Sequence, residues 1–173
     1  MSDNEFVFQE GPKGFYRVWK RVMLEPQEFY KEMSAVGGFE NPLIFVGICE
    51  VVFLTLKLVV SGFTDTVNAL VLVSLSYAFG PGILMLVSQF IFKGEGDYEG
   101  TLRTCAYAGA CLVLAWIPIL GILALLYSSY LVFLGTERIH KLDATKAAIT
   151  TLIGILVTTA IIFYVLKERW PLL

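Results

Sequence analysis

The stretch AWIPILGILALLYSSYLVFLGTERIHKLDATKAA, residues 115–148, decides the fold. It begins as a long apolar run that contains Pro118 and Gly121 with no charged residue near them. It then ends in six ionisable residues within ten positions, 137–146. A helix in a soluble core needs neither feature. A chain that crosses a bilayer, turns back and emerges again needs both, because the turn requires helix breakers and the exit requires charge.

The composition of the whole chain agrees with this interpretation. Of 173 residues, 57% are hydrophobic and 16% charged, and the mean hydropathy is +0.72. A soluble domain carries about a quarter charged residues, whereas the apolar residues here form stretches close to the ~20 residues of a spanning helix. The sequence therefore predicts an all-α polytopic membrane protein. A net charge of −2 and the absence of a basic face or motif exclude nucleic acid as a partner.

Five membrane-spanning helices are expected, at 43–60, 70–92, 102–117, 119–135 and 147–166. They form one transmembrane domain, 42–166, between an N-terminal segment, 1–41, and a short tail, 167–173. Asn41-Pro42 is expected to begin the first span, because Asn caps free N–H groups and Pro suits the first turn. Asp97 and Asp143 are expected to begin the third and fifth spans.

The break at Pro118 and Gly121 separates the third span from the fourth. Residues 105–135 would form a straight helix of roughly 46 Å at 1.5 Å per residue, half as long again as the ~30 Å hydrocarbon core. A tight hairpin at IPILG gives two short spans instead. The alternative is one long kinked helix.

The distribution of Lys and Arg indicates the orientation of the chain. With five spans and the N-terminus inside, ten such residues are cytoplasmic and two are external, Lys167 and Arg169. The ten are Lys13, Arg17, Lys20, Arg21, Lys31, Lys93, Arg103, Arg138, Lys141 and Lys146. The N-terminus lacks the layout of a cleaved signal peptide. We therefore expect a cytoplasmic N-terminal segment and an external C-terminal tail.

The N-terminal segment contains an amphipathic pattern in KGFYRVWKRVML, 13–24. Phe15, Trp19, Val22 and Met23 follow helical spacing, and the basic residues occupy other faces. Such a helix lies naturally on an anionic leaflet, which makes Arg17, Trp19, Lys20 and Arg21 the candidate lipid-surface residues. After Pro26 a second amphipathic run is expected, ending at Gly37-Gly38. The alternative is that both helices pack on each other and on the cytoplasmic ends of the spans.

Two polar or irregular features fall inside the expected spans. Glu50 lies mid-span, where an acidic residue costs at least ~2.5 kcal/mol and is a functional candidate; alternatively it is protonated or bonds to a neighbouring helix. Lys57, two turns later, is too far for a direct salt bridge and is expected to extend to the external interface. Gly80-Pro81-Gly82 predicts a kink that either exposes backbone to a substrate or shapes the packing.

Nothing in the sequence predicts catalysis, a cofactor or a metal. The three cysteines fall in apolar segments without metal-ligand spacing, and the single histidine, His140, has no partner arrangement. No nucleophile motif, phosphate-binding glycine loop or paired acid site is present. We expect a non-enzymatic protein.

Four motifs in order resemble the Yip1 family in its short prokaryotic form. They are L-E-P-x-x-F at 24–29, NPLIF at 41–45, WIPILG at 116–121 and G-x-x-x-x-H-K-L-x-x-x-K-A at 135–147. The similarity covers about residues 20–166, and the order and spacing of the motifs carry it. It implies five transmembrane helices with a cytoplasmic N-terminus. Eukaryotic members are membrane-traffic proteins of the ER and Golgi that associate with prenylated Rab-type GTPases and with each other.

The chain departs from the eukaryotic signatures. DLYGP is reduced here to FENPL, which keeps only Pro42, and GYSLFVYIP to Trp116-Ile117-Pro118. Rab binding is therefore not carried over, and a prokaryotic plasma membrane is the expected location.

Two hypotheses of function follow. The first is a membrane scaffold or adaptor whose cytoplasmic face, 13–31 with the 93–103 and 137–146 loops, engages anionic lipid or a protein partner and whose spans associate with further copies. The second is a small transporter, channel or lipid conduit that uses Glu50 and the break at Pro81.

Overall fold

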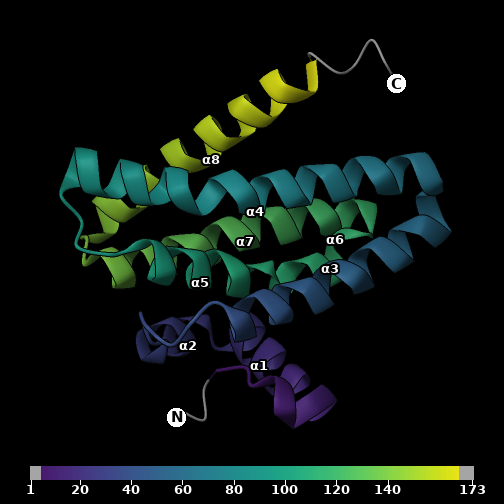
Figure 1. Cartoon of the computed structure of the whole chain (residues 1–173), viewed down its shortest axis with the longest axis horizontal. Helices are drawn as coiled ribbons and strands as arrows, with labels where there is room; N and C mark the ends of the chain where they lie inside the picture. The colour runs from purple at the N-terminus through teal and green to yellow at the C-terminus, as the bar shows by residue number, and fades with distance from the viewer. Residues whose placement is uncertain (1–4, 168–173) are drawn as a thin grey trace.

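The computed structural model describes residues 5–167, and every regular element within them is helical (Figure 1). Four helices, α3, α4, α7 and α8, are long and apolar enough to cross a membrane. The expected all-α membrane class is thus confirmed. The expected tail, 167–173, lies outside the described residues except for Lys167. The elements are η1 (Phe8–Glu10), α1 (Gly11–Leu24), α2 (Pro26–Glu32), α3 (Glu40–Ser61), α4 (Phe63–Phe92), α5 (Tyr98–Ala108), η2 (Gly109–Cys111), α6 (Leu112–Ala115), α7 (Pro118–His140) and α8 (Ala144–Lys167).

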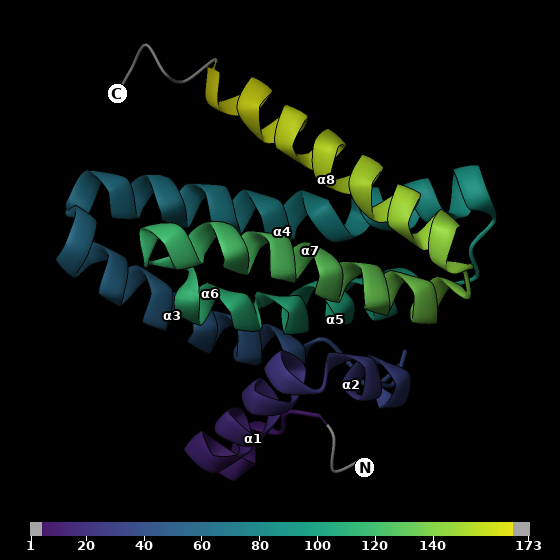
Figure 2. The same ribbon diagram turned by 180° about the vertical axis from the view of Figure 1, so that it is seen from behind.

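The long helices form a bundle. Only Gly62 separates α3 from α4, and its φ of +82° suits a residue without a side chain. Helix α8 packs on α4 and α7, and both views show its C-terminal half diverging from the bundle (Figures 1 and 2). The close approach of α8 to α4 depends on Gly154, where a Cβ would lie 2.4 Å from Leu84 Cδ2. Many large apolar side chains on the four helices are exposed, as lipid contact requires.

The third expected span is not a single helix. The stretch 98–115 consists of α5, the 3₁₀ turn η2 and the single turn α6. The polar side chains of α5, among them Thr101, Arg103 and Thr104, are buried. Because α3, α4 and α7 all pack against α5, this stretch lies inside the bundle.

The chain reverses at Trp116-Ile117, and Pro118 occupies the first turn of α7. Helices α5 and α6 pack back against α7, which excludes one long kinked helix. Gly121 permits this reversal, because a Cβ there would lie 2.7 Å from the carbonyl oxygen of Ala115. Pro118 and Gly121 therefore act together, one by ending the preceding helix and the other by allowing close contact.

Two of the three expected helix starts are confirmed. Asp97 accepts a hydrogen bond from the Gly100 N–H at 2.8 Å, and Asp143 accepts one from the Lys146 N–H at 3.0 Å. The expected cap at Asn41 is wrong. Helix α3 begins at Glu40, one residue before Asn41, so Asn41 lies inside the helix. Its Oδ1 accepts a hydrogen bond at 3.3 Å from the N–H of Phe8.

The described N-terminal residues, 5–39, are called the platform below. Platform and bundle share one hydrophobic core, with Phe6, Phe15 and Phe29 packed against Phe45 of α3 and Tyr107 of α5. The ring centroids of Phe15 and Phe45 lie 5.2 Å apart, and those of Phe29 and Tyr107 lie 4.9 Å apart. The aromatic side of the platform therefore faces the protein interior.

Candidate functional site

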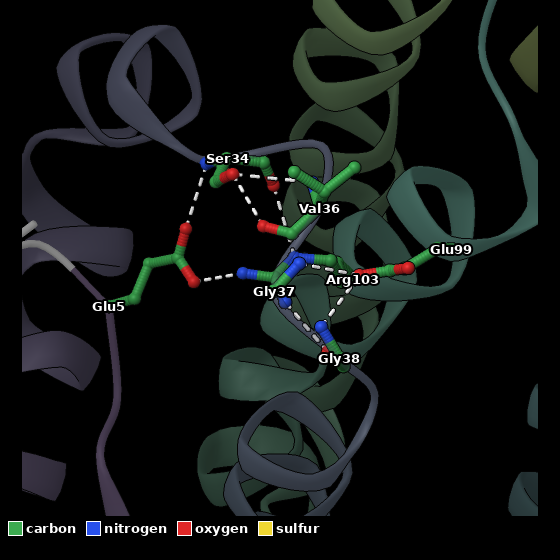
Figure 3. A network of polar contacts seen from close by, with 7 residues as sticks. All are labelled: Glu5, Ser34, Val36, Gly37, Gly38, Glu99 and Arg103. Atoms are coloured by element: carbon green, nitrogen blue, oxygen red, sulfur yellow. Dashed lines mark hydrogen bonds and ion pairs between the residues drawn. The ribbon is translucent and has the colours of Figure 1, made fainter. Parts of the chain in front are cut away.

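Arg103 joins the platform to the bundle. Its side chain, 2% exposed, pairs with Glu5. It also donates to the carbonyl oxygens of Ser34 at 3.0 Å and Gly38 at 2.7 Å (Figure 3). One turn earlier on α5, Glu99 accepts hydrogen bonds from the N–H groups of Gly37 and Gly38, both at 2.7 Å. Two side chains of α5 thus bind the backbone of the linker between α2 and α3.

The geometry explains the two glycines of the linker. Gly37 has a φ of +144° and Gly38 a φ of +88°, which non-glycine residues rarely adopt. A Cβ on Gly37 would lie 3.2 Å from the Arg103 guanidinium. The remaining oxygen of Glu5 accepts a hydrogen bond from the Ser34 N–H at 2.8 Å. Arg103, counted in the sequence among the cytoplasmic charges, lies on α5, where its cation is buried and paired.

Hydrogen bonds to the middle of the bundle hold the rest of the platform. The indole N–H of Trp19 donates to the carbonyl oxygen of Ala110 at 3.0 Å. The hydroxyl of Tyr127 donates to the carbonyl oxygen of Met23 at 2.8 Å. The indole of Trp19, a candidate lipid-surface residue, thus bonds to the bundle.

The basic candidates of α1 differ from one another. Arg17 pairs with Glu10, and Arg21 donates to Glu32 at 2.5 Å. Lys20 is exposed and forms no ion pair with a described residue.

An exposed stripe runs along the outer side of α1. Tyr16, Lys20 and Leu24 follow one another at intervals of four residues and therefore share one face. Tyr16 is 61% exposed and Leu24 68%. We call these three residues the α1 stripe.

Glu50 and Lys57, the intramembrane candidates, share no hydrogen bond or ion pair within residues 5–167. The Oε1 of Glu50 is buried and has no hydrogen-bond partner among the described residues. Lys57 is half-buried and forms no ion pair with a described residue. Helix α4 continues through Pro81, which is buried. A Cβ added to Gly80 or Gly82 would make only ordinary van der Waals contacts, so the predicted kink stays a prediction.

Sequence reasoning missed a buried polar cluster near the end of α7. His140 ends α7 and is fully buried, with Nε2 2.9 Å from the Thr101 Oγ1. Gly94 and Gly96 lie against it, since a Cβ on Gly96 would be 2.7 Å from His140 Nδ1. Within residues 5–167 no group of three or more His, Cys, Asp or Glu is arranged to hold a metal. The trace of this cluster in the sequence is the pair of closely spaced glycines before α5. Nothing in the sequence connects them to a histidine more than forty positions away.

Comparison with known proteins identifies the family. The model of the Yip1 domain matches residues 20–166, which comprise most of the chain, from the second half of α1 to the last turn of α8. Comparisons with curated proteins and with solved structures find no match. With its apolar helices, the match shows an integral membrane protein, and the chain belongs to the Yip1 family.

Proposed function

We propose that this protein is a non-enzymatic membrane scaffold or adaptor that engages protein partners and lipid through the platform. One observation carries the proposal. The platform is fastened to the bundle by a buried ion pair and hydrogen bonds, yet it leaves the α1 stripe uncovered. A rigidly held, exposed surface of this kind is suited to docking, because little conformational freedom is lost on binding.

The chemistry of the α1 stripe supports a protein or membrane contact. Two large apolar side chains flank a lysine on one helical face, and exposed apolar groups rimmed by polar residues mark interaction sites. Lys13 is also exposed and forms no ion pair with a described residue. Arg17 and Arg21, in contrast, have glutamate partners. We therefore assign the positive charge that would contact a partner to Lys13 and Lys20.

Affinity capture tests the adaptor. The tagged chain is purified from its native membrane in mild detergent, and retained proteins are identified by mass spectrometry. We expect a stoichiometric partner that is lost in Tyr16→Ser/Lys20→Glu/Leu24→Ser and kept in the charge-matched control Lys93→Glu. Retention of lipid or further copies alone would refute the adaptor role.

The proposal includes five spans with α5, η2 and α6 forming the third, a cytoplasmic N-terminus and a prokaryotic plasma membrane. Single cysteines in a background without Cys49, Cys105 and Cys111 test the topology. An impermeant maleimide added outside should label Asp65→Cys and leave Thr145→Cys unlabelled until the membrane is opened. Labelling of Thr145→Cys in intact cells would contradict this orientation.

A second candidate function, a small conduit, is favoured by the unpartnered Oε1 of Glu50. If Glu50 lines a conduit, Glu50→Gln should abolish flux or shift its pH dependence in reconstituted vesicles. If the protein is an adaptor, the same variant should keep its partner. Flux that is unchanged in Glu50→Gln would remove this candidate.

A further inference from the structure

Two adjoining cavities follow α7 on the side of the platform. The first, of about 670 Å³, lies between α2 and the C-terminal half of α7 and has a mixed lining, whose polar members include Gln27, Lys31, Glu137, Arg138 and Lys141. The second, of about 520 Å³, is lined almost entirely by apolar side chains, including Met23, Leu114, Leu120, Leu123, Leu126 and Tyr127. Tyr130 lines both cavities, so we treat them as one groove with a polar and an apolar half.

The dimensions of the groove fit one leaflet of a bilayer. From Arg138 to Leu126 the groove follows twelve residues of α7, which is about 18 Å at 1.5 Å per residue. Half of the ~30 Å hydrocarbon core is about 15 Å, so a head at Arg138 places an acyl chain of one leaflet beside Leu134, Tyr130 and Leu126. Phe133 and Leu134 also line the polar half, so apolar side chains continue along α7 up to the charged residues at 137–141. An amphiphile with one leaflet-length chain and a polar head matches this order.

The charges of the polar half indicate the head. Three cations and one carboxylate, Glu137, line it. The ammonium of Lys141 already lies 2.6 Å from Glu95. Lys31 and Arg138 are exposed and form no ion pair with a described residue. With Lys141 neutralised by Glu95, the lining has one uncompensated positive charge, which complements a singly charged phosphodiester.

We propose that this groove binds one anionic phospholipid, with its phosphodiester between Lys31 and Arg138 and an acyl chain along Leu134, Tyr130 and Leu126. Arginine is well suited to the phosphate because its planar donors match the phosphate oxygens. Basic pockets between helices at a membrane surface bind anionic headgroups in the same way. The inference rests on the proposed function, since it names the lipid that the platform engages.

The lipid bridges the platform and the bundle. Lys31 belongs to α2 and Arg138 to α7. The floor of the groove already contains a contact between these elements, from the Gln27 side-chain amide to the Tyr130 hydroxyl at 3.3 Å. A bound phosphodiester adds a second, charged contact across the same interface.

Native mass spectrometry of the full-length protein tests the proposal. The detergent-solubilised chain is mixed with equal amounts of phosphatidylglycerol and phosphatidylcholine, and retained lipids are counted per chain. We expect one retained phosphatidylglycerol, and a loss of about tenfold or more in its retention in Lys31→Gln/Arg138→Gln, because two charge-assisted contacts disappear. Leu123→Trp should reduce retention by obstructing the apolar half.

Matched controls separate the groove from the surface in general. Lys93→Gln/Lys146→Gln removes the same number of positive charges as the groove variant, but outside the groove. Leu152→Trp changes a residue of similar exposure on α8, 59% against 56% for Leu123. Both controls should retain lipid as the wild type does. Equal retention of the two lipids by the wild type, or equal losses in groove and control variants, overturns the proposal.

The outcome is independent of the adaptor test. The groove variants leave the α1 stripe unchanged, and partner capture does not require counting bound lipid. Partner capture by the α1-stripe variant therefore tests the adaptor alone. Lipid retained equally by the wild type and Lys31→Gln/Arg138→Gln overturns the groove, whatever happens to the partner.

Discussion

Breaking the Arg103–Glu5 pair should release the platform from the bundle. The Arg103 side chain is 2% exposed and that of Glu5 15%. Removing one partner of a buried ion pair costs about 3–5 kcal/mol, because the other charge remains without compensation. We expect Glu5→Gln to be the more damaging change, since Arg103 would stay charged with only carbonyl partners. Arg103→Met leaves Glu5 with some exposure and the Ser34 N–H.

Hydrogen exchange followed by mass spectrometry measures this release locally. If the platform opens as a unit, a cost of about 3 kcal/mol accelerates exchange of the α1 and α2 amides by a hundredfold or more, since ~1.4 kcal/mol corresponds to a factor of ten. Amides of α4 and α8, which form no hydrogen bond or ion pair with Arg103 within residues 5–167, should be unaffected. The double variant Glu5→Gln/Arg103→Met should lose less stability than the two single variants lose together, by about 1.5 kcal/mol or more.

The exposed pair Lys141–Glu95 is the control. Its side chains are 68% and 66% exposed, and such pairs contribute about 0–1 kcal/mol. Lys141→Met should therefore leave platform exchange within a few-fold of the wild type. Additive losses of stability in the Arg103–Glu5 double-mutant cycle would refute the assignment of this pair as the contact that holds the platform on the bundle. Equal acceleration of hydrogen exchange in α1, α4 and α8 would refute it too.

Three further predictions concern helix ends and packing. Gly121→Ala should lower the free energy of unfolding in thermal denaturation by about 1–3 kcal/mol, because its Cβ would lie 2.7 Å from the Ala115 carbonyl oxygen. The control Gly47→Ala, whose Cβ would have nothing within 4 Å, should be neutral or stabilising in the same thermal denaturation. Equal effects of the two changes would contradict the close-approach argument. The hydrogen bond from the lysine side chain three residues on holds the pKa of Asp143 below its usual value of 3.8. Asp143 should therefore stabilise α8 fully above about pH 4, and this contribution should be lost as the pH falls through the lowered folded-state pKa, whereas Asp143→Asn should show no such acid step in a circular-dichroism titration. Trp19→Phe should cost about 1 kcal/mol through loss of one hydrogen bond and remove a fluorescence component protected from aqueous quenchers; a quenched Trp19 would place its indole in solvent.

Local features of the chain made much of the bundle predictable. Apolar length determines which segments can span a membrane, and α3, α4, α7 and α8 correspond to four expected spans. Breakers and caps act within a few residues, so the reversal before Pro118 and the helix starts at Asp97 and Asp143 were accessible from sequence. The family match agrees with motifs whose order is a property of the chain itself.

What only the tertiary structure decided involves residues far apart in the chain. Arg103 resembles a flanking membrane charge in the sequence, and Asn41 resembles a cap. Their actual partners are Glu5 and Phe8, which lie 98 and 33 positions away. A helical face with Phe15 and Trp19 is equally suited to a bilayer and to a protein interior, because both are apolar. Hydrophobic periodicity determines that a face will be buried, and only the packing of the chain determines what buries it.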